Sequence, residues 1–253
     1  MRLTKRLKQL VSIRRSSDNA SLPGQVNVTH FSESYFTIGG HGVHTAVVEL
    51  VAAQRKAGHP VQANTFYRHG WLHLHTLGPL SALRSLFHRG VRCATAHITP
   101  ASLVGSIRGA AILEPIIKRY MSCFYNSMAV VIAPTEVTLC ELRDGGVRVP
   151  IKVIPNGIDR ATFTASSIPR SIMRRQLGLS DSCFMVLCVG QLQPRKGIET
   201  FLGCARALPD IRFVWVGDFL FGPASDQRRS IRRMVANAPS NVKFTGQLAA
   251  LRT

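Results

Sequence analysis

Residues 184–216 contain two short apolar runs separated by a polar loop and a helical pattern, and they restrict the fold more than any other segment. The first run, 184–189, ends at Gly190, and the second, 213–216, ends at Gly217. Two strands joined by a helix pair in parallel, because the crossover helix returns the chain to the end of the sheet at which the first strand began. The segment therefore predicts half of a nucleotide-binding α/β domain.

The loop inside this segment carries two adjacent cations, Arg195 and Lys196, just before the helix. A loop between a strand's carboxyl end and a helix's amino end is where such sheets hold phosphorylated ligands. Two cations there can neutralise a diphosphate, both on binding and as charge builds on it when a glycosidic bond breaks. A solvated turn is the alternative. Gly39 and Gly40 give a weaker signal of the same kind, since plain loops also use glycine.

The same alternation of strands and helices runs through the rest of the chain and predicts an α/β protein with parallel sheets. Helices are expected from about His41 to Ala57, from Pro79 to Gly90, after Pro115 and after an N-cap at Thr135. Strands are expected at 26–31, 61–66, 72–75, 91–96, 129–133, 151–154, 184–189, 212–216 and 242–245.

Composition shifts along the chain suggest two domains. Residues 1–25 form a basic N-terminal extension, and 26–159 form a first α/β domain. Residues 160–182 are mixed and polar, as a connection between domains would be. Residues 183–253 form a partial second domain, with fewer strands than such a sheet normally has.

The charge balance predicts an anionic partner. The chain has 32 Lys and Arg against 13 Asp and Glu, a formal charge of +19. Nucleic acid, an acidic membrane surface and phosphorylated substrates all fit this excess. No apolar stretch approaches 18 residues, so we expect no membrane span. The six cysteines include no CxxC pair, which favours free thiols in a reducing, cytoplasmic compartment.

Histidines provide the candidate reactive groups of the first domain. His97 follows the strand expected at 91–96 and would face the cleft of an open α/β sheet. A neutral imidazole there could hydrogen-bond a sugar hydroxyl or act as a base, although a lone histidine is more often structural. His73 and His75 share a strand face and, with His69, raise a metal hypothesis. No carboxylate or cysteine completes a set at metal-ligand spacing, so no metal site is predicted.

The helix expected after Pro79 carries an apolar stripe of leucines and a phenylalanine with basic residues around it. Taken alone, this pattern favours a helix that faces the core. The alternative is an interfacial helix whose apolar residues enter lipid while its cations meet anionic headgroups. The residues assigned to this membrane or acceptor surface are Leu80, Leu83, Arg84, Leu86, Phe87, Arg89 and Arg108.

Two motifs, VIPNGID at 153–159 and NVKFTG at 241–246, flank a unit of strand, loop, Lys-Gly and helix. This combination resembles the family 4 glycosyltransferases of GT-B fold. Three further motifs are TAHITPASLVGS at 95–106, GQLQPRKG at 190–197 and FVWVGDFLFG at 213–222. They resemble more closely the bacterial 1,2-diacylglycerol 3-glucosyltransferases, or monoglucosyldiacylglycerol synthases. The resemblance covers residues 26–248.

This resemblance implies two Rossmann-like domains and the retaining transfer of glucose from UDP-glucose to the hydroxyl of 1,2-diacylglycerol. In the family, a glycine-rich turn near the donor phosphates matches Gly39 and Gly40. A histidine near the donor sugar matches His97, which makes it the candidate catalytic residue. A lysine that holds the diphosphate matches Lys196.

The chain departs from the family pattern in two places. The family's donor-site arginine is Gln191 here, next to Gly190, which leaves Arg195 as the candidate second cation. The family's Glu-x7-Glu segment should follow NVKFTG, and the chain ends before it, so we expect a C-terminally truncated protein with exposed apolar sheet surfaces. Another family 4 enzyme, such as a phosphatidylinositol mannosyltransferase, and an inactive lipid-binding remnant are the alternatives.

The resemblance also implies the partners. We expect a peripheral protein on the inner face of the cell membrane, with an anionic membrane surface, diacylglycerol and a nucleotide-sugar donor as partners. No tightly bound cofactor is expected; Mg²⁺ is compatible with the donor, but no DxD motif indicates it. Nucleic acid is not expected, because the chain has no RNP pattern or zinc spacing.

Overall fold

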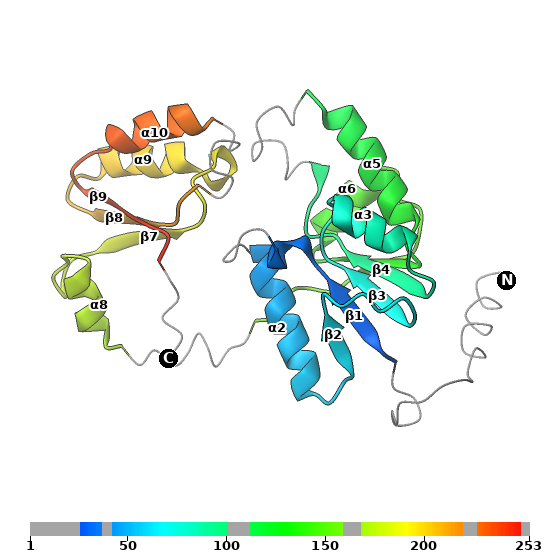
Figure 1. Ribbon diagram of the computed structural model, residues 1–253. Helices are drawn as coiled ribbons and strands as arrows, with labels where there is room; N and C mark the ends of the chain where they lie inside the picture. Colours follow the sequence, from blue (N-terminus) through cyan, green and yellow to red (C-terminus); the bar gives the residue numbers. More distant parts are fainter. Residues whose placement is uncertain (1–25, 37–41, 101–111, 159–167, 220–226, 249–253) are drawn as a thin grey trace.

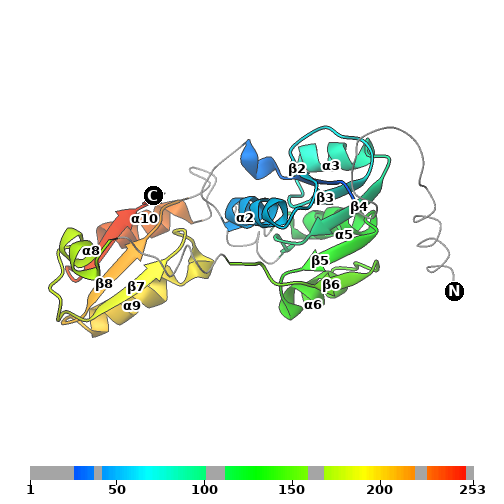
Figure 2. The same ribbon diagram turned by 90° about the horizontal axis from the view of Figure 1, so that it is seen from below.

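The computed structural model describes residues 26–36, 42–100, 112–158, 168–219 and 227–248. They form two α/β units, each with its own sheet (Figures 1 and 2). Every pairing between neighbouring strands of the two sheets is parallel. The α/β fold with parallel sheets is thus confirmed.

The first sheet has six strands in the order β2-β1-β3-β4-β5-β6. Most strands begin and end within a residue or two of the predicted positions. The predicted strand 61–66 is too long, because Asn64 has a φ of 53° and its side-chain oxygen accepts the N–H of Ser32. The strands are β1 (Val28–Phe31), β2 (Val61–Ala63), β3 (Trp71–Leu74), β4 (Val91–Thr95), β5 (Val130–Ala133) and β6 (Ile151–Val153).

Alternate strand residues of this sheet enter different layers, as the two-residue period of a strand requires. Leu72 and Leu74 join the main core, with Met121 and Phe124. His73, between them, faces away from that core. The helical elements of the unit are η1 (Glu33–Tyr35), α2 (Gly42–Lys56), α3 (Pro79–Leu86), α5 (Glu114–Asn126) and α6 (Glu136–Asp144).

The second sheet has three strands, β7 (Met185–Val189), β8 (Arg212–Val216) and β9 (Val242–Gly246), in that order. One face packs against the helices α9 (Ile198–Ala207) and α10 (Arg228–Ala236). This core holds Phe201, Phe213, Trp215 and Ile231. The strands and the helix predicted from the apolar runs therefore form a helix layer packed on a sheet.

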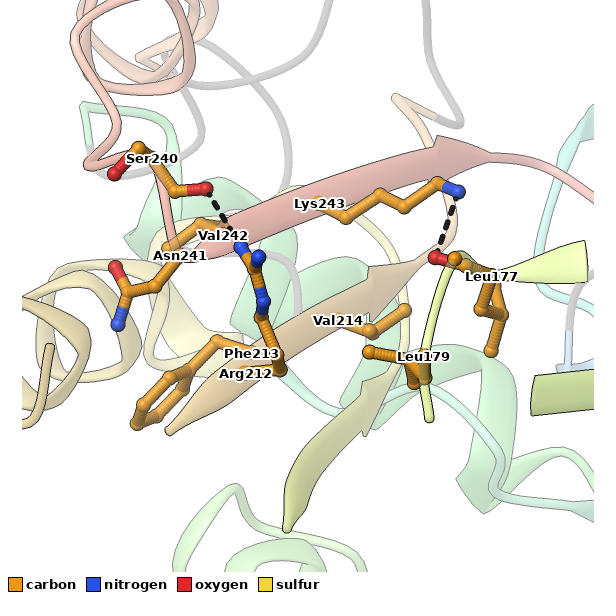
Figure 3. Close-up of a pocket in the computed structure, with 10 residues that line it drawn as sticks. Leu177, Leu179, Arg212, Phe213, Val214, Ser240, Asn241, Val242 and Lys243 are labelled. Atoms are coloured by element: carbon orange, nitrogen blue, oxygen red, sulfur yellow. Dashed lines mark hydrogen bonds between the residues drawn. The ribbon is translucent and has the colours of Figure 1, made fainter. Parts of the chain in front are cut away.

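The opposite face of this sheet is partly open. Leu187 and Val189 of β7 are 52% and 71% exposed there. The segment after α8 (Arg170–Gln176) covers part of the face, where Lys243 Nζ donates to the Leu177 carbonyl at 3.1 Å (Figure 3). The described residues just after α8 therefore contact the second sheet.

Among the described residues, no helix is long and apolar enough to cross a membrane.

Candidate functional site

The loop 190–197 begins where β7 ends and is fixed there by backbone geometry. The Gly190 N–H donates to the Val216 carbonyl, and the Trp215 indole donates to the Gly190 carbonyl, both at 2.9 Å. The Lys196 side chain lies along Gly190: a Cβ added at that glycine would be 3.7 Å from Lys196 Cδ. The loop therefore holds Lys196 at the carboxyl edge of the sheet.

Gly217 brings the ends of β7 and β8 close together. Its φ is 133°, and a Cβ there would lie 2.0 Å from the Gly190 carbonyl oxygen. Only glycine fits this position without moving the backbone. This close approach determines the backbone geometry at the carboxyl ends of β7 and β8, where the loop 190–197 begins.

Two exposed cations, Arg195 and Lys196, lie just ahead of α9. Arg195 Nε donates to the Gln193 side-chain oxygen at 2.9 Å, and Gln193 is buried. Gly197 takes the left-handed conformation and starts α9, whose first turn has no side-chain cap. Two cations and a helix amino end thus gather at one edge, which is an arrangement that attracts phosphate.

His97 lies two residues after β4 and is partly buried. Burial lowers its pKa to about 4, so the ring is neutral at physiological pH. Its Nε2 is 3.3 Å from His75 Nδ1. A neutral ring at a strand's carboxyl end can exchange hydrogen bonds with a sugar hydroxyl but carries no charge to offer a phosphate.

The histidine cluster contains a member that the sequence analysis missed. His30 on β1 is in register with His73 on β3, and its Nδ1 is 2.9 Å from His75 Nε2. His69 lies exposed in the preceding loop, so the predicted grouping with His73 and His75 was wrong about its third ring. A strand pairing between β1 and β3 creates the cluster, and no local pattern signals it.

Burial keeps these rings neutral as well. It lowers the pKa of His73 to about 3 and that of His75 well below the ordinary value. Burial also lowers the pKa of His30, although the hydrogen bond that His30 donates to the Gln54 oxygen acts in the opposite direction. Neighbouring imidazoles lower the pKa of His73 and His75 further, because a second charge would repel the first. The cluster is therefore a buried, uncharged, polar layer next to Gln54 of α2.

Helix α3 has the reverse of the usual amphipathic arrangement. Leu80, Leu83 and Leu86 are 49%, 51% and 76% exposed, whereas Ser81 and Ser85 are buried. The inner face is polar: the Ser81 N–H donates to a Glu33 carboxylate oxygen at 2.8 Å, and Ser81 Oγ is 2.7 Å from Thr76 Oγ1. The expectation that the leucine stripe faces the core was wrong.

Arg84 was predicted among the cations of the membrane surface, but the structure buries it. Its side chain is buried, and its guanidinium donates to the carbonyls of Thr65 and Tyr67. These bonds remove Arg84 from the exposed cations of this surface. Arg89 remains exposed.

Further apolar rings enlarge the surface around α3. Phe87, at the helix end, is 55% exposed, and Phe66 is 77% exposed in the loop before β3. The Arg68 guanidinium lies 6.0 Å from the Phe87 ring centre, and the Arg84 guanidinium lies 5.9 Å from that of Phe66. We call Phe66, Leu80, Leu83, Leu86 and Phe87 the α3 surface. Phe66 was not predicted, since its loop has no periodic pattern.

Three predicted site residues, Gly39, Gly40 and Arg108, lie outside the described residues. Gln191 is partly buried next to Gly190.

Comparison with known proteins shows which sequences and folds this chain resembles. Residues 63–162 match the sequence model of Glycosyltransferase Family 4. The chain is 30% identical over 233 residues to the alpha-galactosylglucosyldiacylglycerol synthase of Streptococcus pneumoniae. The aligned region covers 88% of this chain and 60% of that protein. It is 25% identical over 136 residues to the processive diacylglycerol alpha-glucosyltransferase of Acholeplasma laidlawii, covering 53% of this chain and 40% of that protein. The resemblance drawn from the motifs is confirmed.

The fold is also found in solved structures. The Anabaena protein HepE, solved in complex with UDP and glucose, superposes with a TM-score of 0.67 at 19% identity, covering 89% of this chain and 70% of HepE. The described units thus have the GT-B type of fold, with the second unit partial. The chain spans about 60% of the length of the Streptococcus relative.

Proposed function

We propose that the protein, which carries a Glycosyltransferase Family 4 segment and a GT-B type of fold, belongs to an enzyme that glycosylates lipids at a membrane surface. In its specific form, the proposal is retaining transfer of glucose from UDP-glucose to the hydroxyl of 1,2-diacylglycerol. Similarity to two diacylglycerol glycosyltransferases supports the lipid acceptor, and the UDP and glucose bound by HepE support the donor. The observation that carries the proposal is the outward-facing apolar stripe of α3.

The donor side of the reaction uses the loop 190–197. As the bond between the sugar C1 and the phosphate oxygen breaks, negative charge builds on the departing UDP, and Lys196 and Arg195 offset it with the amino end of α9. The acceptor oxygen forms the new bond to C1, and its proton leaves with the phosphate. In this proposal, neutral His97 would exchange a hydrogen bond with the donor sugar, and Gly39 and Gly40 would serve the donor phosphates.

The acceptor side uses the α3 surface. Its exposed leucines and phenylalanines would enter the lipid, where each fully buried side chain gains about 1.5–3 kcal/mol. Arg68, Arg89 and Arg108 would meet anionic headgroups, each adding about 1 kcal/mol near such a surface. The protein would therefore be peripheral, on the cytoplasmic face where anionic lipids are concentrated.

The full-length protein should incorporate labelled glucose from UDP-glucose into diacylglycerol in liposomes that contain anionic lipid. The rate should fall when the anionic lipid is replaced by a zwitterionic one. A parallel reaction with GDP-mannose and phosphatidylinositol tests the alternative acceptor and donor, and added EDTA tests for Mg²⁺. Activity only in the mannose reaction, or in neither, would refute the specific proposal.

A further inference from the structure

A hydrogen-bonded chain of side chains runs from α2 to the carboxyl edge of the first sheet. Gln54 on α2 places its side-chain oxygen 2.7 Å from His30 Nε2. His30 Nδ1 is 2.9 Å from His75 Nε2, and His75 Nδ1 is 3.3 Å from His97 Nε2. The chain therefore links a helix residue to His97 through two buried rings.

The amide oxygen of Gln54 gives this chain a direction. An oxygen can only accept, so His30 Nε2 carries the hydrogen and His30 Nδ1 must accept. His75 Nε2 then carries the hydrogen that His30 accepts, which leaves His75 Nδ1 to accept from His97 Nε2. Each ring is neutral and has one N–H, so the acceptor oxygen of Gln54 determines which nitrogen carries the hydrogen in every ring.

We propose that Gln54, acting through His30 and His75, fixes the tautomer of His97, with the hydrogen on Nε2 and the lone pair on Nδ1. His97 would then present an acceptor, rather than a donor, to a ligand hydroxyl. Gln54 is in this view a positioning residue, remote from the ligand. The part of this inference that concerns the donor sugar rests on the proposed function, whereas the tautomer itself does not.

The surroundings of the chain suit this role. The chain needs neutral rings, and burial supplies them by lowering the pKa of all three histidines. His73 packs beside the chain with its ring centre 4.1 Å from that of His75, while its Nε2 pairs with Thr95 Oγ1 at 2.7 Å. His73 therefore packs against the hydrogen-bonded series of side chains without being a member of it.

Ring nitrogens of His30, His73 and His75 lie within 4.8 Å of one another, a spacing that a transition metal would also fit. The 2.9 Å separation of His30 Nδ1 and His75 Nε2 is that of a hydrogen bond between the two facing nitrogens. A bound ion would need both lone pairs and would abolish the direction of the chain. Metal analysis of the purified protein is therefore part of the test.

Long-range ¹H–¹⁵N correlation spectra of the whole protein, labelled on its histidine rings, report which ring nitrogen carries each hydrogen. At pH 7.5 and without donor, His30, His75 and His97 should all show the hydrogen on Nε2. The spectrum of a His97→Gln variant assigns the His97 signals. A hydrogen on His97 Nδ1, or one equivalent of bound metal, would overturn the proposal without any further variant.

Two variants test the path. Gln54→Leu should leave His97 as a mixture of tautomers, and His75→Phe should do the same by interrupting the chain. Thr95→Val is the matched control, because it removes a hydrogen bond from the same cluster but off the path, and it should leave the His97 tautomer unchanged. An unchanged His97 signal in folded Gln54→Leu, checked by circular dichroism, would contradict the inference.

Transfer activity provides a separate measurement. If the proposed function holds, Gln54→Leu should slow glucose transfer about tenfold, comparable to the loss of the hydrogen-bond partner that orients a metal-binding histidine. A fixed tautomer with no transferase activity would count against the proposed function alone. Full activity in a variant that has lost the tautomer would show that the chain has no catalytic role.

Discussion

Arg195 and Lys196 are adjacent cations with different restraints. Arg195 is held by Gln193, while the Lys196 side chain lies against Gly190 at the edge of the sheet. We expect Lys196→Ala to reduce glucose transfer at least about 100-fold, the usual effect of removing one group that stabilises developing charge. Arg195→Ala should have a smaller effect in the same assay.

Arg206→Ala is the control for lost positive charge, because Arg206 is exposed in the last turn of the same helix, α9. Its rate should match that of the wild type. Unchanged rates in both Lys196→Ala and Arg195→Ala would show that the loop does not bind the donor diphosphate.

Gly217 occupies a position that excludes a side chain, whereas Gly203 occupies one that has space for a side chain. Gly217→Ala would place a methyl group against the Gly190 carbonyl in a backbone conformation that alanine rarely adopts, so the free energy of unfolding should fall by at least about 1–3 kcal/mol. Gly203 lies within α9, and a Cβ there meets nothing within 4 Å. Gly203→Ala should therefore raise the free energy of unfolding by up to about 1 kcal/mol. Urea titrations followed by Trp215 fluorescence measure both, and equal effects would contradict this description of the strand ends.

At the scale of the element, α3 tests whether its exposed apolar residues bind lipid. Leu83→Glu combined with Phe87→Glu should reduce binding to anionic liposomes at least tenfold, because charged side chains would have to enter the lipid. The melting temperature should change little, since both side chains are more than half exposed. Flotation with liposomes measures binding, and calorimetry measures the melting temperature.

Two variants separate this explanation from general effects. Val137→Glu on α6 changes another side chain that is 68% exposed, and it should leave liposome binding intact. Ser81→Leu adds an apolar side chain to the buried polar face of α3 and should destabilise the unit by about 1–3 kcal/mol. If the glutamate variant unfolds and Ser81→Leu does not, α3 faces the core as its sequence pattern suggested.

At the scale of the whole molecule, the two units should respond differently to acid. All nine histidines precede residue 98, so the second unit has none. Burial lowers the pKa of His73 to about 3 and of His97 to about 4 from an ordinary 6.5, and it lowers those of His30 and His75. The positive charge of Arg55 also lowers the pKa of His30.

Between the lowered pKa values of the buried histidines and 6.5, the unfolded protein binds more protons than the folded protein. The free energy of unfolding of the first unit is therefore highest above pH 6.5 and falls as the pH drops below it. Each such histidine contributes a slope of up to about 1.4 kcal/mol per pH unit. The first unit should therefore lose stability steeply between pH 6.5 and pH 4, while the second should be less affected.

The chain provides one tryptophan reporter in each unit, Trp71 and Trp215. Urea unfolding of a Trp215→Phe variant follows the first unit, and that of a Trp71→Phe variant follows the second. Equal acid sensitivity of the two units would show that the buried histidines are not responsible.

The sequence by itself determined the succession of strands and helices and the parallel sheets, and its motifs indicated the resemblance to family 4 glycosyltransferases. Apolar runs such as 184–189 form strands, and their glycines and the following cations can be located from neighbouring residues, whereas the contacts of Gly190 with Trp215 and Val216 depend on the pairing of β7 with β8. The tertiary structure decided which face of α3 is buried, because Glu33, Thr76 and the carbonyls that receive Arg84 come from other segments. It also decided the histidine chain. Periodicity places His73 and His75 on one face of a strand, but only the pairing of β1 with β3 brings His30 beside them, and only the packing of α2 supplies Gln54. Contacts between distant segments depend on how the layers pack, and no local pattern encodes that packing.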